Sequence, residues 1–303
     1  MRILVLFKQI ILSTFAPMQT KTLIPLRFNL FVLLLALSVL CAHAQILMTG
    51  GGDPLREDSV KRDFSNQPYF GLYKDNYFIF GPSLGPKPTR QNTNIKFQIS
   101  VAQRLTRATL PWDTYLYLFY SQKCFWNVLE NSMPMTDLNF NPGIGITKPL
   151  FVKNRYIGKL TLLIEHESNG RDSIESRSWN RIALAANVFV TKNLMVHGKI
   201  WIPIVDGENN RDIVDYCGFF QAGLQVVSDN RRFSGGITVV KRKGFNLNSN
   251  VIVDLSYRIF KRDNQFLFLQ YYNGYGEGLL DYNKFHSQLR IGLLIKPKLF
   301  SDF

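Results

Sequence analysis

Polar and apolar residues alternate along the chain from about residue 67 to the end. Segments of roughly ten residues, separated by turn-like sequences, show this alternation, as strands do when one face meets lipid and the other a polar lumen. An even number of strands closes a sheet and pairs every backbone group. The pattern predicts an all-β fold, a 12-stranded antiparallel transmembrane β-barrel of the outer membrane, with strands near residues 68–81, 93–105, 114–126, 138–148, 156–168, 176–191, 193–202, 214–227, 231–241, 248–259, 264–275 and 286–296.

The N-terminus has a different pattern, that of a secretory signal peptide. Lys21 and Arg27 precede an apolar run at 28–40, and small residues follow at 42–44. This order predicts cleavage after Ala44, so residues 1–44 are expected to be a signal peptide. Residues 45–66 are polar and are expected to form a flexible extension, leaving 67–303 as the barrel domain. Lipid attachment at Cys41 is disfavoured, because the residues before it are bulkier than such signals usually allow.

Composition narrows the class of partner. Without residues 1–44 the chain keeps 32 basic and 22 acidic residues, a net charge of +10. A basic protein facing anionic lipid head groups needs no nucleic-acid partner to explain its charge. After the signal no run of 18 apolar residues occurs, which excludes a spanning helix.

Connection lengths predict which end of the barrel faces outward. Tight turns are expected at 192, 228–230 and 261–263, and longer loops at 203–213 and 276–285. In such barrels short turns face the periplasm and long loops face the exterior. Successive connections alternate between the two ends of the barrel, and the loop at 169–175 falls in the same set as the long loops. It is therefore expected at the extracellular rim.

The stretch H-E-S-N-G-R-D-S-I-E-S-R-S-W-N-R, from His166 to Arg181, carries the candidate chemistry. The predicted strand at 156–168 leads into this stretch, and in it the apolar Leu162 and Ile164 alternate with charged residues such as Glu165. The same alternation places His166 and Ser168 on the lipid side. In the following strand Asn180 falls on the lipid side as well. Polar groups are unfavourable there. For a lone His or Ser a wetted rim patch is the better interpretation, but three such residues on one face favour a site.

These residue types suit acyl transfer. A histidine two residues from a serine on one strand face is close enough to take the serine proton, and Asn180 would accept the other ring N–H and fix the tautomer. Gly170 offers a backbone N–H as an oxyanion donor. The Asp/Ser-rich loop has oxygen ligands that suit Ca²⁺. An ester at the lipid boundary of a barrel predicts a phospholipid substrate and an acyl-serine intermediate.

The stretch resembles the outer membrane phospholipase A (phospholipase A1) family, whose signature H-x-S-N-G-R…S-R-S-W-N-R is matched from His166 to Arg181. The resemblance runs from about residue 67 to the end and includes 120–123, 139–142 and 274–283. It implies that His166 is the general base, Ser168 the nucleophile, Asn180 the orienting residue and Gly170 the oxyanion donor.

The resemblance also implies a calcium-bound homodimer. Its Ca²⁺ would be held by the backbone carbonyl of Arg171 and the side chain of Ser176, with Ser132 of the partner subunit. Gln122 matches a family glutamine at the dimer interface, and strand alternation turns it toward lipid. A lone polar rim residue remains the alternative for Gln122.

The expected function is therefore calcium-dependent hydrolysis of sn-1 and sn-2 acyl esters and of lysophospholipids, activated by dimerisation. Two alternatives stay open: a passive pore or structural barrel without activity, and a different outer-leaflet deacylase, such as one that acts on lipid A.

Overall fold

The structure is a computed structural model that describes residues 69–106, 109–153, 155–205, 207–244, 246–260 and 263–297. The expected signal peptide at 1–44, the extension at 45–66 and the terminal Phe303 lie outside the described residues. The elements are β1 (Phe70–Leu72), β2 (Asn76–Pro82), β3 (Thr93–Arg104), β4 (Tyr115–Trp126), β5 (Met135–Val152), β6 (Arg155–Ser168), η1 (Ser173–Glu175), β7 (Ser178–Phe189), β8 (Leu194–Ile204), α4 (Ile213–Cys217), β9 (Phe220–Val227), β10 (Phe233–Lys241), β11 (Ser249–Arg258), β12 (Gln265–Gly274) and β13 (His286–Ile295).

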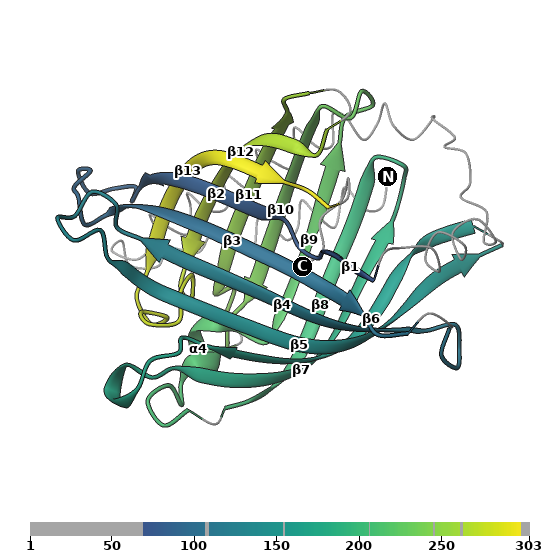
Figure 1. Ribbon diagram of the computed structural model, residues 1–303, viewed down its shortest axis with the longest axis horizontal. Helices are drawn as coiled ribbons and strands as arrows, with labels where there is room; N and C mark the ends of the chain where they lie inside the picture. The colour runs from purple at the N-terminus through teal and green to yellow at the C-terminus, as the bar shows by residue number, and fades with distance from the viewer. Residues whose placement is uncertain are drawn as a thin grey trace, which may run out of the picture. The chain divides into compact units, whose positions relative to one another are not determined.

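The strands form a closed antiparallel barrel (Figure 1). Each strand from β3 to β13 pairs with its neighbours in sequence, and β2 closes the ring by pairing with both β13 and β3. The short strand β1 also pairs with β3, so β1 and β2 together occupy one of twelve positions in the ring. The predicted all-β, 12-stranded antiparallel barrel is confirmed.

Two of the predicted strands differ from the structure in more than the positions of their ends. The single strand predicted at 68–81 is replaced by β1 and β2, which are separated by residues 73–75. The strand predicted at 214–227 is wrong for its first part, because α4 occupies 213–217 and β9 begins at Phe220. Ile213 of α4 is fully buried in a cluster with Trp179, Trp201, Leu279 and Tyr282. The apolar residues of this segment thus pack inside the barrel instead of facing lipid.

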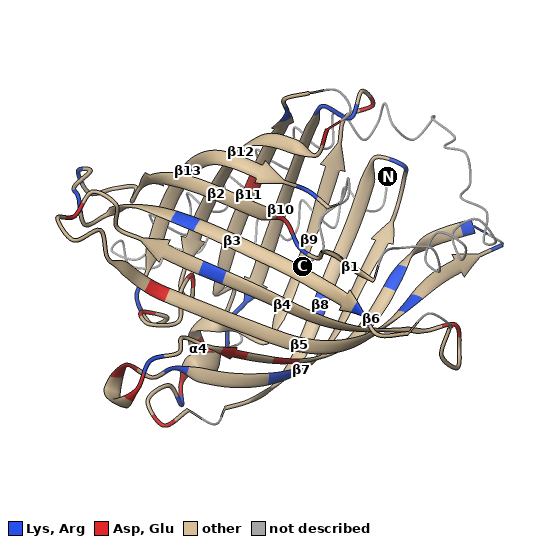
Figure 2. Cartoon of the chain, in the orientation of Figure 1, with Lys and Arg blue, Asp and Glu red and all other residues tan. Residues whose placement is uncertain are grey.

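The two faces of each strand differ in polarity as the alternation predicts. On β6 the outward Ile164 is 57% exposed, whereas the neighbouring inward Glu165 is 2% exposed. Lys96 and Lys199 are likewise buried in the lumen. Most of the charged positions in Figure 2 lie in the connections at the ends of the strands. Within the described residues no helix has the length and hydropathy to cross a bilayer.

Side chains fill the lumen. The cluster around Trp179 and Trp201 joins α4 and the 275–285 connection to the inner wall. Farther round the barrel, Glu277 binds Lys96 at 3.1 Å and Arg290 at 2.6 Å. These contacts hold the 275–285 connection inside the barrel mouth, at the end where the long connections gather.

Candidate active site

His166 and Asn180 lie directly opposite each other on β6 and β7. Their side chains form a hydrogen bond of 2.8 Å between His166 Nδ1 and Asn180 Oδ1. Because an amide oxygen only accepts, Nδ1 is the donor in this contact, and in the neutral ring this leaves the lone pair on Nε2. The predicted pairing of His166 with Asn180 is therefore present in the structure, in the tautomer that a general base at Nε2 requires.

Ser168 follows His166 on the same outer face and pairs with Ser178 of β7. Residues two apart on a strand have Cα atoms about 6.5 Å apart. No hydrogen bond joins His166 to Ser168, both of which lie in the described part of the chain.

The inner face of β6 and β7, behind the three residues, carries a buried ion network. Glu165 pairs with Lys199 at 2.6 Å, and Arg181 pairs with Glu167 at 3.0 Å. Trp179 donates its indole N–H to Glu167 at 3.1 Å. Trp179 therefore faces the lumen, and the sheet separates its side chain from those of His166, Ser168 and Asn180. The network ties β6, β7 and β8 together behind the outer face.

Asn169 organises the loop that follows Ser168. Its side chain is 3% exposed and accepts hydrogen bonds from the backbone N–H groups of Arg177 (3.0 Å) and Arg171 (3.3 Å). It also donates to the carbonyl of Glu175 at 2.8 Å. One buried amide thus sets the path of residues 170–177, which the sequence interpretation did not identify.

Gly170 needs to be glycine for two reasons. Its φ is +63°, a conformation that side-chain-bearing residues rarely adopt, and an added Cβ would lie 2.8 Å from the ring of Phe140.

We expect Gly170→Ala to move the loop and lower the rate of hydrolysis by about 10²-fold, the scale for a lost oxyanion donor. Activity per folded molecule is the measurement.

Gly71→Ala is the matched control, because no atom lies within 4 Å of the Cβ it would add. Equal activity of Gly170→Ala and Gly71→Ala would contradict an oxyanion role for Gly170.

The residues proposed for Ca²⁺ lie on two connections. Ser176 follows η1 and Arg171 precedes it, whereas Ser132 is exposed between β4 and β5. The Arg171 guanidinium is turned away to other partners, Glu175 and the Thr136 carbonyl (2.6 Å). No group of three His, Cys, Asp or Glu side chains among the described residues is arranged to hold a metal. An ion here would depend on carbonyl and hydroxyl oxygens, which suit a hard cation such as Ca²⁺.

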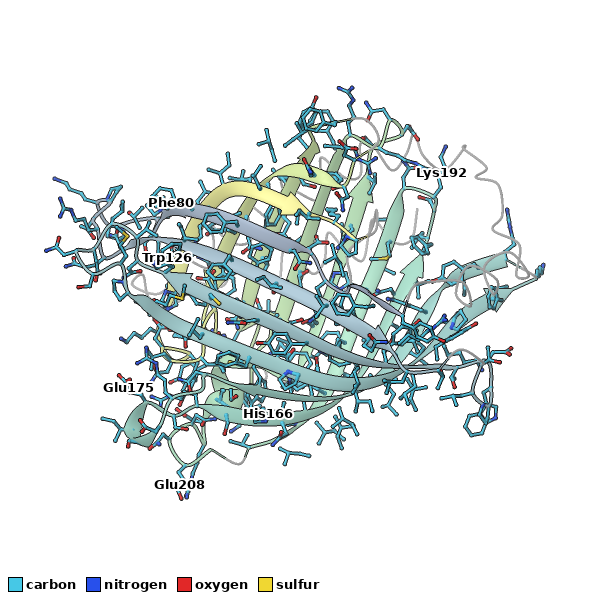
Figure 3. All side chains as sticks on the ribbon, viewed as in Figure 1. Phe80, Trp126, His166, Glu175, Lys192 and Glu208 are labelled. Atoms are coloured by element: carbon cyan, nitrogen blue, oxygen red, sulfur yellow. The ribbon has the colours of Figure 1, made fainter. Side chains whose placement is uncertain are left out.

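The β8–β9 connection forms hydrogen bonds with the loop that follows Ser168 and with the start of β7. Asn210 is fully buried and pairs with the backbone of Ser178 in both directions, at 3.2 Å and 2.8 Å. Asn209 donates to the carbonyl of Ser173 at 2.7 Å. Figure 3 shows His166, Glu175 and Glu208 at one end of the barrel, with Lys192 at the opposite end. The long connection therefore positions the start of β7, two residues before Asn180.

Gln122 lies on β4 and already has partners within the chain. It accepts a hydrogen bond from the Tyr120 hydroxyl at 2.9 Å and donates to Cys124 Sγ at 3.4 Å. These two bonds use one N–H and one lone pair of the amide, which leaves a second N–H and a second lone pair for a partner at a dimer interface.

Comparisons with known proteins identify relatives of this barrel. The family model described as phospholipase A1 matches residues 71–295. The phospholipase A1 of Escherichia coli (strain K12) is 31% identical over 212 residues, covering 66% of this chain and 69% of that protein. The phospholipase A1 of Proteus vulgaris is 32% identical over 215 residues, covering 66% and 68%.

Solved structures agree. The outer membrane phospholipase A from Escherichia coli superposes with a TM-score of 0.68 at 25% identity, covering 81% of this chain and all of that one. A Salmonella typhi outer membrane phospholipase dimer with bound calcium gives a TM-score of 0.67 at 25% identity, covering 78% and 95%. The chain belongs to the phospholipase A1 family and is an outer-membrane β-barrel protein.

Proposed function

We propose that the protein is a calcium-dependent outer-membrane phospholipase with A1, A2 and lysophospholipase activity, activated by dimerisation. The observation that carries the proposal is the His166–Asn180 hydrogen bond, with Ser168 next to it on the lipid-facing wall. A base, a nucleophile and an orienting amide on this wall would meet an ester in the outer leaflet. The site residues and the division into 1–44, 45–66 and 67–303 are part of the proposal.

The proposed reaction proceeds in two steps. Ser168 Oγ attacks the ester carbonyl carbon while His166 Nε2 takes its proton, and Asn180 keeps the imidazole oriented. The Gly170 N–H stabilises the oxyanion. The tetrahedral intermediate then expels the glycerol oxygen, which receives the proton from His166. Water, deprotonated by the same ring, then attacks the acyl carbonyl carbon. The second tetrahedral intermediate expels Ser168 Oγ, which takes the proton back from His166, and the fatty acid leaves.

Arg171 and Ser176 of one subunit, with Ser132 of the partner subunit, would hold the calcium ion. When bound, the ion supplies positive charge that polarises the ester carbonyl. The oxygen-only donor set of the loop supports Ca²⁺, as does the relative that is a calcium-bound dimer.

Hydrolysis by purified protein, assayed with Ca²⁺ and with chelator, tests the enzyme class and the cofactor together. We expect phospholipid hydrolysis with Ca²⁺, and a loss of about 10²-fold on chelation, comparable to the loss of an oxyanion-hole donor. Equal rates in both conditions would contradict calcium dependence. Hydrolysis of lipopolysaccharide but not phospholipid would identify the other deacylase, and conductance without hydrolysis a pore. The filled lumen favours the enzyme over the pore.

Dimerisation gives a separate prediction. We expect crosslinking between subunits to rise with Ca²⁺ and a non-hydrolysable substrate analogue, and to fall in Gln122→Ala, because an interfacial amide contributes about 0.6 to 2 kcal/mol in lipid. Gln265→Ala removes an exposed amide from the end of β12 and is the control. Crosslinking that is the same with chelator would show that assembly is not coupled to calcium.

A further inference from the structure

The ladder between β5 and β6 is interrupted at His166. Phe140 pairs with Ser168 on one side of the gap, and Gly143 with Glu165 and Ile144 with Ile164 on the other. The same register on both sides places Pro142 opposite His166. Proline has no N–H to donate to a neighbouring strand. The β5 backbone therefore offers no donor to the His166 carbonyl.

A side chain replaces the missing donor. Asn141 Nδ2 donates to the His166 carbonyl oxygen at 2.7 Å. Asn141 is 8% exposed and lies on the inner face of β5, whereas the His166 side chain is on the outer face. The contact thus reaches the catalytic strand from behind, through the gap that Pro142 leaves. A buried carbonyl without a partner is unfavourable, so this hydrogen bond fixes the local backbone.

We propose that Asn141 is a positioning residue of the active site, which holds the His166 backbone in place of the ladder hydrogen bond that Pro142 cannot make. It touches neither the substrate nor the reacting atoms. Its effect passes through the His166 main chain, which carries the imidazole that binds Asn180. The inference rests on the proposed function, because it concerns the same site.

The test is a set of four variants assayed for phospholipid hydrolysis with Ca²⁺. Asn141→Ala is expected to lower kcat about tenfold, since small displacements of a catalytic group are costly, and to leave KM within about twofold. The rate at which a fluorophosphonate labels Ser168 should fall in parallel, because it depends on the same base. Pro142→Ala restores an N–H opposite His166, so Asn141→Ala/Pro142→Ala is expected to regain most of the lost kcat.

Asn139→Ala controls for the loss of a buried amide from the same strand and face. Asn139 is 2% exposed, and its side chain accepts from the Leu279 N–H at 3.2 Å instead of contacting β6. We expect it to lower thermal stability without a tenfold fall in kcat, and without rescue by Pro142→Ala. An equal fall in kcat in Asn139→Ala, or no rescue of Asn141→Ala by Pro142→Ala, would overturn the proposal.

Wild-type activity separates the two possible failures. If the wild-type protein hydrolyses phospholipid and Asn141→Ala matches its kcat, only the role of Asn141 is rejected. If the wild-type protein neither hydrolyses phospholipid nor reacts with the fluorophosphonate, the proposed function itself fails.

Discussion

Ser168→Ala is expected to abolish phospholipid hydrolysis, with a loss of kcat of about 10⁴-fold or more. Without the hydroxyl no acyl-enzyme forms, and the His166–Asn180 pair has no nucleophile to activate. What remains is the contribution of substrate binding and of the oxyanion donors, which in serine hydrolases is a small fraction of the total rate enhancement. Hydrolysis in detergent with Ca²⁺, normalised to folded protein, is the measurement.

Ser178→Ala is the matched control for this loss. Ser178 stands directly opposite Ser168 on β7 and on the same outer face, and its two hydrogen bonds with Asn210 are made by its backbone, which alanine keeps. We expect its kcat to stay within about threefold of wild type, as for most surface substitutions. If Ser168→Ala kept wild-type activity, a serine mechanism would be excluded, and a large loss in Ser178→Ala would indicate damage to the sheet.

The strand pattern was predictable because the membrane imposes it. One face of each strand meets lipid and the other a polar lumen, so Ile164 and Glu165 of β6 reveal their directions in the sequence alone. The alternation rule fails for residues 213–219, where it predicted the start of a strand. Ile213 belongs to the inner cluster and Cys217 packs against it. A short apolar segment has the same composition whether it packs inside the barrel or faces lipid as part of a strand, so its sequence does not distinguish the two.

The site was predictable where it depended on alternation and unpredictable where it depended on distant contacts. Alternation put His166, Ser168 and Asn180 on one face, and the register brings His166 and Asn180 together. Asn141 and Asn210 contact the site from 25 and 32 residues away. Each uses a side-chain amide to satisfy a backbone group, and no local pattern distinguishes such an amide from a solvated one.

Glu277 is another residue whose role only the fold reveals. It lies in the 275–285 connection, 3% exposed, and joins Lys96 of β3 to Arg290 of β13. Arg290 also donates to Asn94 at 2.9 Å, and Lys96 to Gln270 at 2.7 Å. One carboxylate therefore bridges two buried cations on β3 and β13, the strands that lie on either side of β2 where the barrel closes.

Glu277→Gln is expected to lower the free energy of unfolding by about 3–5 kcal/mol at pH 7, because it leaves two cations buried without their counter-charge. Guanidinium unfolding in detergent, followed by tryptophan fluorescence, measures the change. Glu208→Gln is the control, since Glu208 is exposed on the β8–β9 connection. Its effect is expected to stay within about 0.5 kcal/mol. Equal effects of the two substitutions would show that the Glu277 cluster does not stabilise the fold.

The same carboxylate predicts how stability depends on pH. Burial by itself raises the pKa of Glu277, but Arg290 and Lys96 outweigh it and lower the pKa from 4.5 to about 2. Since the folded-state pKa is depressed, the unfolded chain binds the proton more readily, and the stabilisation is complete above pH 4.5 and lost as the pH falls toward 2. The difference in unfolding free energy between wild type and Glu277→Gln should therefore narrow across this interval. A difference that stays constant from pH 6 to pH 2 would mean that Glu277 is not ionised in the folded barrel, and that its contacts with Lys96 and Arg290 do not depend on its charge.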